Sequence, residues 1–435
     1  MSSQPLPSDM DAAPDTVNAD TDQTVARMAR SAREGQRILS QMSGEARARA
    51  LKSAAAAVRE QKAQILAANA RDVEAAGARA LADALVDRLA LSPARIDGLA
   101  DAIETIAGQP DPLSQKLGTH IRPNGLEIEK RPVPLGVIGI IYESRPNVTT
   151  DAAALAFFAG NGVVLRAGSD SLESAVALHA AFRAGLTHEG APAQAVQLIK
   201  TTDRAVVGAL LRAQGLIDLI IPRGGRSLVA RVQNEARVPV LAHLEGVCHL
   251  YLDRDAELEM AKDVIINAKL RRPGICGALE CLLIDRKILK IATPILEALA
   301  EKGAQLIADE AVRGIFPSAA RANEDDWGRE YLSPKLAVRV VDGIDGALDY
   351  LRSYSSGHTE GILTENAATA DRFLAEVDSA IVMVNTSTQF ADGGEFGMGA
   401  EIGIATGRMH ARGPVGAREL TSYKYVVKGQ GQIRP

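Results

Sequence analysis

The stretch from Val133 to Tyr142 is a nearly continuous apolar run that is rich in β-branched residues. Strands buried on both faces of a parallel sheet have this composition, whereas half-exposed strands alternate apolar and polar residues. Helical patterns and further short apolar runs follow in alternation as far as residue 252. This succession predicts a doubly wound parallel sheet, as expected of a dinucleotide-binding domain. We therefore expect an α/β fold.

Other parts of the sequence predict N-terminal helices, a second α/β domain and a small β arm. The dipeptide Asn124-Gly125 is typical of a two-residue hairpin turn. Beyond residue 253 the strongest strand patterns are 279–285, 305–308 and 335–341. The expected parts are a disordered tail at 1–22, a dinucleotide-binding domain at 23–119 and 133–252, a second α/β domain at 253–390, and a β arm at 120–132 and 415–430.

Charge and composition exclude several classes of protein. Lys and Arg number 49 against 54 Asp and Glu, which gives a mixed surface with net charge −5 and argues against a nucleic-acid partner. Three cysteines cannot form a disulfide framework, and they lack the paired spacing of a metal site. No apolar run approaches the ~20 residues that cross a bilayer. The first residues lack the features of a signal peptide. We expect a cytoplasmic protein with no bound metal.

The three cysteines differ in their surroundings. Cys248 and Cys281 lie in apolar, strand-like segments, where cysteine is usually a small core residue. Cys276 instead lies on a loop bracketed by Pro and Gly, and Arg271 and Arg272 precede it. Nearby cations favour the thiolate form. Local sequence leaves a nucleophilic role and a structural role for Cys276 equally open.

Three further segments follow predicted strands, at the edge where α/β proteins bind ligands. Asn147 can donate its amide to an oxyanion, although capping a helix or turn is its commoner role. The pair Gly224-Gly225 would let a cofactor approach a helix N-terminus that includes Ser227. A lone glycine pair is weak evidence. The segment 166–170 adds the cation of Arg166 and a small hydroxyl.

Together these segments resemble the aldehyde dehydrogenase superfamily and, within it, the gamma-glutamyl phosphate reductase (glutamate-5-semialdehyde dehydrogenase) family. The resemblance spans residues 23–430, and its most specific motif is 341–362. Further matching segments are 143–147, 246–249, 267–269 with Cys276 after it, 384–394 and 410–414.

The resemblance implies a fold and a reaction. It makes 253–390 the catalytic domain, Cys276 the nucleophile and Asn147 the oxyanion donor. The implied reaction is the NADPH-dependent reduction of L-glutamyl 5-phosphate to L-glutamate 5-semialdehyde in proline biosynthesis. Phosphate is released, and the acyl group passes through a thioester on the cysteine. The cofactor residues would be Arg166, Ser169, Gly224, Gly225 and Ser227.

Cofactor choice follows from comparing segment 166–170 with NAD-preferring relatives, which typically carry Lys at the position of Arg166 and Glu at that of Ser169. Without that carboxylate, and with a planar cation, the segment suits a 2′-phosphate. This interpretation requires Asp170 to cap the following helix. For the substrate phosphate we expect Arg412 with His410, although a structural ion pair is an open alternative for Arg412. Glu245 aligns with the base of hydrolytic relatives and is a further candidate.

Two other functions compete with this interpretation. One is an NAD-linked hydrolytic aldehyde dehydrogenase that oxidises semialdehydes, and the other is a catalytically silent scaffold. The resemblance also implies that the β arm, 120–132 and 415–430, builds a homodimer or homotetramer. Association with glutamate 5-kinase is a further property that the family resemblance suggests, and no residue of this chain argues for or against it.

Overall fold

The computed structural model describes residues 19–79, 81 and 83–434. The chain divides into two compact units, the first comprising Met1–Val240 and Leu420–Pro435 and the second Leu241–Glu419. The expected disordered tail, 1–22, lies outside the described residues as far as residue 18. Its last four residues instead begin helix α1 (Ala19–Leu39), where Asp20 and Asp22 occupy the first turn. Carboxylates there are stabilised by the positive end of the helix dipole, which the prediction overlooked.

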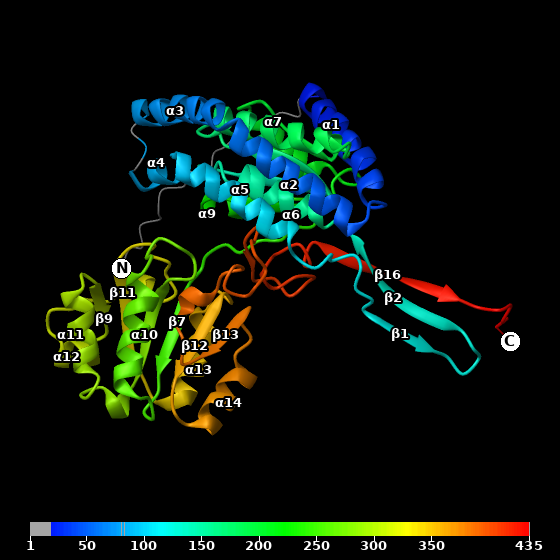
Figure 1. Ribbon diagram of the computed structural model, residues 1–435. Helices are drawn as coiled ribbons and strands as arrows, with labels where there is room; N and C mark the ends of the chain where they lie inside the picture. The colour runs from blue at the N-terminus through cyan, green and yellow to red at the C-terminus, as the bar shows by residue number, and fades with distance from the viewer. Residues whose placement is uncertain (1–18, 80, 82, 435) are drawn as a thin grey trace. The chain divides into compact units, whose positions relative to one another are not determined.

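The first unit is built on a parallel sheet. Figure 1 shows helices that belong to this unit. The strands of the sheet are β3 (Val137–Tyr142), β4 (Gly162–Ala167), β5 (Val196–Leu198) and β6 (Leu219–Arg223), in the order β5-β4-β3-β6. The chain therefore fills one side of β3 with β4 and β5 and then crosses to the other side with β6. Ligands of doubly wound sheets bind beyond the carboxyl ends of the strands where the order reverses. In this unit that point lies between β3 and β6.

Helices surround this sheet as the sequence predicts. Apolar residues of α1, α8 and α9 form one buried cluster with Val137, Ile141 and Val164. Right-handed crossovers place α6 and α7, which connect β3 to β4 and β4 to β5, on the other face. The remaining helices of the unit are α2 (Gly44–Glu60), α3 (Lys62–Ala78), α4 (Asp83–Leu89), α5 (Pro93–Ala107), α6 (Val148–Phe158), α7 (Leu172–His188), α8 (Ala205–Arg212) and α9 (Arg226–Glu235).

The β arm is a separate antiparallel sheet in the order β1-β2-β16, with β1 (Gly118–Ile121), β2 (Glu127–Pro134) and β16 (Thr421–Lys428). The hairpin is present, but the prediction of a two-residue turn was wrong. Ile121 pairs with Glu127, so five residues form the loop. Within it the Arg122 amide donates to the Leu126 carbonyl at 2.8 Å, and Gly125 adopts φ +85°. The positive φ of Gly125 favours glycine, as the sequence predicts, but the loop is longer than the two-residue turn that was expected.

The second unit contains a parallel sheet in the order β10-β9-β11-β8-β7-β12-β13. The sheet includes β7 (Cys248–Leu252), which pairs with both β8 and β12. The expected boundary at Leu252 was therefore wrong, because 241–252 belongs to the second unit and β7 is an interior strand of its sheet. The other strands are β8 (Leu279–Asp285), β9 (Gln305–Ala308), β10 (Ala320–Arg321), β11 (Lys335–Val341), β12 (Thr359–Leu363) and β13 (Ile381–Val384).

Helices cover both faces of this sheet. Leu282 and Ile284 of β8 face a cluster with α10 (Leu258–Leu270), α11 (Thr293–Glu301) and α12 (Glu310–Ile315). The alternate residues Cys281 and Leu283 face α13 (Gly343–Tyr354) and α14 (Ala367–Glu376). A short two-stranded sheet of β14 (Ile404–Ala405) and β15 (Gly413–Pro414) completes the unit. Among the described residues, no helix combines the length and apolar character that a bilayer span requires.

Candidate active site

Cys276 lies on the loop that joins α10 to β8 in the second unit. Its thiol is free and half-buried, whereas Cys248 and Cys281 are buried in strands. Burial raises the pKa of the Cys281 thiol to about 12 and that of the Cys248 thiol well above its usual value. Since the thiolate is the nucleophilic form, neither buried cysteine is suited to attack an acyl group. The expected difference among the three cysteines therefore has a physical basis.

The Cys276 loop packs closely against the segment that precedes β7. A Cβ on Gly246 would lie 2.6 Å from the Cys276 Cβ and 2.4 Å from its carbonyl oxygen, so only glycine fits there. The thiol of Cys248 donates to the Cys276 carbonyl at 3.0 Å. The Gly246 amide donates to the Glu330 carboxylate at 3.0 Å. These contacts hold the backbone of the Cys276 loop, residues 271–278.

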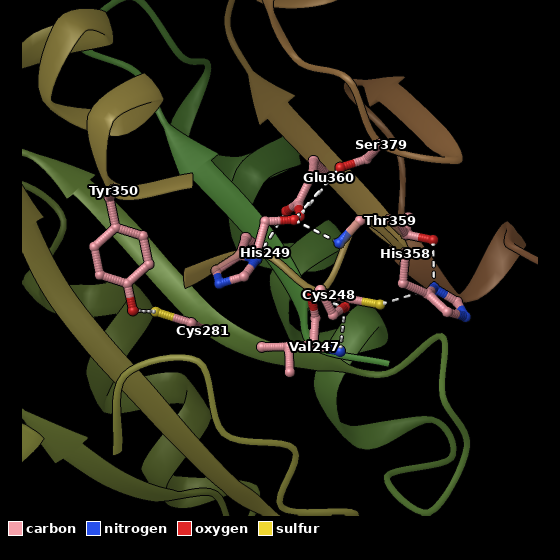
Figure 2. Close-up of polar contacts among 12 residues, drawn as sticks. Val247, Cys248, His249, Cys281, Tyr350, His358, Thr359, Glu360 and Ser379 are labelled. Atoms are coloured by element: carbon pink, nitrogen blue, oxygen red, sulfur yellow. Dashed lines mark hydrogen bonds and ion pairs between the residues drawn. The ribbon is translucent and has the colours of Figure 1, made fainter. Parts of the chain in front are cut away.

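Two histidines lie beside the Cys276 thiol. One ligand atom each of His243, Cys276 and His358 lies within 4.8 Å of the others, and the two rings meet edge to face at 5.2 Å between centroids. The His243 Nδ1 donates to the Ile404 carbonyl at 2.6 Å. Figure 2 shows the Cys248 sulfur directed at the His358 ring, whose Nδ1 lies 2.8 Å from the Thr359 hydroxyl. These contacts orient both rings.

A buried ion pair joins the two elements that flank the Cys276 loop. Lys269 Nζ, at the end of α10, lies 2.6 Å from the Glu280 carboxylate at the start of β8, and both side chains are fully buried. Burial lowers the pKa of Lys269 and raises that of Glu280 to about 7. Glu280 also accepts the Leu332 amide at 3.1 Å. The pair therefore ties α10, β8 and a neighbouring loop together.

Asn147 lies in the first unit, at the N-cap position of α6 just beyond β3. Its side chain makes no capping hydrogen bond. Instead Nδ2 donates to the Asp151 carboxylate at 3.0 Å. Burial raises the pKa of Asp151 to about 6. The side-chain amide carries two hydrogens, so this contact orients the amide and occupies one of them.

The expected cofactor segments of the first unit meet at the switch point of its sheet. The Glu143 amide, after β3, donates to the carbonyl of Arg223 at the end of β6 at 3.1 Å. A Cβ on Gly224 would lie 2.5 Å from the Glu143 carboxylate. A Cβ on Gly225, the N-cap of α9, would meet nothing within 4 Å, and Ser227 is exposed in the first turn. The Gly225 amide donates to the Glu143 carboxylate at 3.3 Å. A pyrophosphate at this helix N-terminus would therefore take the place of that carboxylate as the bound anion.

Arg166 is buried at the end of β4, with a 3.5 Å contact from Nη2 to the Thr202 carbonyl. Among the described residues, no atom accepts its buried Nε–H. Burial lowers its pKa, the Glu143 carboxylate raises it, and the cations Arg204 and Arg231 lower it. A cluster of arginine charges with an unpaired buried donor suits a phosphate group. Ser169 is exposed on the loop that follows β4.

The expected capping role of Asp170 was wrong. Ser144 adopts the left-handed conformation, at φ +47°, and its hydroxyl donates to the Asp170 carboxylate. The N-cap of α7 is Ser171, which makes no side-chain cap. Asp170 therefore stays near Arg166, where its negative charge favours the charged guanidinium.

Comparisons with known proteins identify the family to which the chain belongs. Residues 7–314 match the model of the Aldehyde dehydrogenase family. The gamma-glutamyl phosphate reductase of Zymomonas mobilis is 55% identical over 413 residues, which cover 94% of this chain and 96% of that protein. That of Brucella suis is 53% identical, covering 96% of this chain and all of that protein. The chain belongs to the aldehyde dehydrogenase family. Its curated relatives place it among the gamma-glutamyl phosphate reductases.

A solved structure extends the similarity to the whole fold. The crystal structure of the Thermotoga maritima gamma-glutamyl phosphate reductase is 45% identical, with a TM-score of 0.92. It covers 94% of this chain and 100% of the other. The α/β fold expected from the sequence is confirmed, as is the resemblance. Members of this family use a nicotinamide cofactor.

The residues expected at the substrate phosphate have other partners in this family member. Arg412 Nη1 lies 2.5 Å from the Asp378 carboxylate, and its Nη2 donates to the Asp378 carbonyl at 2.6 Å. This is the structural ion pair that the sequence left open. His410 is exposed, and its Nε2 lies 2.6 Å from the Glu419 carbonyl. Burial raises the pKa of Glu330, and the charge of Glu245 raises it further.

Sequence reasoning missed several residues of this site. His358 lies in the motif 341–362, and His243 lies three residues before the matching segment 246–249, but neither was assigned a role. The same is true of the Lys269–Glu280 pair and of the charges of Arg204 and Arg231. The sequence did contain a signal for His358, because it lies within the most specific motif, 341–362, and histidine can exchange a proton near neutral pH.

Proposed function

We propose that this chain reduces L-glutamyl 5-phosphate to L-glutamate 5-semialdehyde with NADPH and releases phosphate, in proline biosynthesis. The observation that carries the proposal is the half-buried free thiol of Cys276, with two oriented imidazoles beside it. Gamma-glutamyl phosphate reductases similar to this chain over 94% of its length support the substrate. An acyl phosphate needs a nucleophile and no activated water, because phosphate is a good leaving group.

The first chemical step is attack by the Cys276 thiolate on the acyl carbon. We assign the thiol proton to His358, whose buried Nε2 has no partner among the described residues and whose ring belongs to the Cys276 cluster. The S–C bond forms and the C–O bond to phosphate breaks, which leaves a thioester. We assign the Asn147 amide and the Cys276 backbone N–H to the oxyanion of this step. Asp151 would hold the Asn147 amide in place.

A bound nicotinamide cofactor would supply a hydride to the thioester carbon. The C–S bond would then break, which releases the aldehyde and returns Cys276 as its thiolate. We assign the pyrophosphate of the cofactor to Gly224, Gly225 and Ser227 at the N-terminus of α9. The preference for NADPH rests on Arg166, with Arg204 and Arg231 near it. Ser169 adds a hydroxyl without a charge that would repel the 2′-phosphate.

The roles of Arg412, His410 and Glu245 at the substrate stay as predictions. For Arg412 to hold the substrate phosphate, the phosphate must compete with Asp378 for the guanidinium. Glu245 has no water to activate in this reaction, so we assign it no step.

We also propose that the protein is a cytoplasmic homo-oligomer assembled through its β arm. Tyr423, Tyr425 and Val427 of β16 are 47%, 60% and 56% exposed. Three large apolar side chains exposed on one strand favour an interface with a second copy.

The reverse reaction tests the proposed function. Purified protein is given glutamate 5-semialdehyde and NADP⁺, with and without inorganic phosphate, and NADPH is followed by absorbance. We expect NADPH to form only when phosphate is present. Formation at the same rate without phosphate would identify a hydrolytic aldehyde dehydrogenase instead. The Cys276→Ala variant is the control for a reaction at the thiol.

A further inference from the structure

We propose that Cys276, His243 and His358 form a binding site for a thiophilic divalent cation, Zn²⁺ above all, and that the cation blocks the nucleophile when it binds. The sequence predicts no metal site because the three residues come from separate segments. The fold gathers them, with one ligand atom of each within 4.8 Å of the others.

The ligand set selects the kind of metal. A thiolate with two imidazoles is a typical donor set for zinc and its neighbours, and it lacks the oxygens that Mg²⁺ and Ca²⁺ require. Bonds of about 2.0–2.3 Å in a tetrahedron place the ligand atoms roughly 3.3–3.8 Å apart. The three atoms therefore need to approach by about 1 Å, which small rotations of the side chains supply.

Each histidine of the site makes a second contact through its Nδ1, as histidine ligands of metals usually do. The His243 Nδ1 donates to the Ile404 carbonyl, which leaves Nε2 as the ligand nitrogen of the neutral ring. The His358 Nδ1 contacts the Thr359 hydroxyl. Such outer contacts fix the ring orientation and the tautomer of zinc-binding histidines.

His358 supplies an independent observation. Its side chain is fully buried, yet its Nε2 has no hydrogen-bond partner among the described residues. A buried polar atom without a partner costs free energy, so the site gains when a ligand satisfies it. A cation bound to this nitrogen would do so.

Binding and inhibition follow from one exchange. Zn²⁺ replaces the proton of the Cys276 thiol, a Zn–S bond forms, and the proton passes to solvent. Cys276 and His243 are only half-buried, so solvent reaches the site and can supply water or a competing ligand as the fourth ligand. While the bond lasts, the sulfur lone pair cannot attack a carbonyl. The inhibition rests on the proposed role of Cys276 as nucleophile, whereas the binding does not.

The test measures binding and activity separately on the full chain. Co²⁺ is titrated into metal-free protein, and the thiolate-to-cobalt charge-transfer absorption is recorded. Zn²⁺ affinity is then measured by competition with a chromophoric chelator. We expect the absorption in the wild type and its loss in Cys276→Ser. His243→Gln and His358→Gln should each weaken Zn²⁺ binding by at least about tenfold.

The controls separate this site from adventitious binding. His188→Gln removes an exposed histidine of the other unit and should leave the affinity unchanged. Circular dichroism shows which variants are folded, and His243→Gln, at a half-buried position, keeps the test valid if His358→Gln unfolds. Equal Zn²⁺ affinity in the wild type and Cys276→Ser would overturn the proposal, as would the absence of cobalt absorption in the wild type.

Activity assays distinguish this proposal from the proposed function. Zn²⁺ should inhibit the wild type, and a chelator should restore its activity. If Cys276→Ser abolishes catalysis but Zn²⁺ neither binds nor inhibits, the metal site is wrong and the reductase assignment stands. If Zn²⁺ binds through Cys276 while Cys276→Ser stays active, the nucleophile assignment is wrong.

Discussion

Lys269 and Glu280 meet at 2.6 Å in the interior of the second unit, one at each end of the loop that carries Cys276. The pair is fully buried, so each charge depends on the other for compensation. This contact links the stability of the unit to the position of Cys276, the proposed nucleophile.

Removing one partner should therefore be costly. We expect Lys269→Met to lower the free energy of unfolding by about 3–5 kcal/mol, because it leaves the Glu280 carboxyl buried without its cation. The double variant Lys269→Met/Glu280→Gln should recover most of that loss, since glutamine still accepts the Leu332 amide. Urea unfolding of both variants is the measurement.

Lys262→Met on the same helix is the control. It breaks only the pair with the exposed Glu259, and we expect little change in the free energy of unfolding. Similar losses for both lysines would contradict this account.

The nucleophile assignment predicts a clear split among the cysteines. Cys276→Ala should abolish reductase activity and preserve the fold and cofactor binding, because no thioester can form. Cys248→Ala and Cys281→Ala should instead lower stability by on the order of 1 kcal/mol. Steady-state rates and thermal unfolding of the three variants test this. A few per cent of residual kcat in Cys276→Ala would already exclude the thioester route.

Asn147 should affect the rate more than binding. Loss of one positioned oxyanion donor typically lowers kcat by about 10²–10³-fold, and we expect this for Asn147→Ala. The KM for the substrate should change far less. Kinetics in both directions separate the two parameters, and an effect confined to KM would make Asn147 a ground-state contact.

Asp151 predicts a dependence of stability on pH. Its pKa rises from 3.8 to about 6 on folding, so the folded state binds the proton more tightly than the unfolded state does. The resulting stabilisation is complete below the unfolded pKa and is lost as pH rises through about 6. The free energy of unfolding of the wild type should therefore fall relative to that of Asp151→Asn between about pH 4 and 6. Parallel curves for the two proteins would refute the shift.

The cofactor preference is tested at Ser169. We expect the wild type to favour NADPH over NADH, and Ser169→Glu to erase or reverse that preference through repulsion of the 2′-phosphate. The ratio of kcat/KM for the two cofactors is the measurement. Ser169→Ala, which adds no charge, is the matched control and should keep the preference. A wild type that favours NADH would overturn this interpretation of Arg166 and Ser169, although not the reductase assignment.

Strand positions could be predicted well because their signal is local. The predicted segments 279–285, 305–308 and 335–341 coincide with β8, β9 and β11. Contacts between distant segments could not be predicted. His243, Cys276 and His358 come together only through the order of the sheet. Asp170 was misassigned because the left-handed Ser144, which binds it, lies 26 residues away.

The pairing of β16 with β2 has a consequence for how the chain is made. The first unit is discontinuous in sequence, because the whole second unit is inserted between Val240 and Leu420. On the ribosome, the edge of β2 emerges early and stays without its neighbour until residue 428 has been synthesised. The buried Asn161, which bonds both the Gly136 amide and the Leu420 carbonyl, likewise waits for its second partner. The second unit, continuous from Leu241 to Glu419, can complete its core first, so the unit that begins the chain is the last to finish folding.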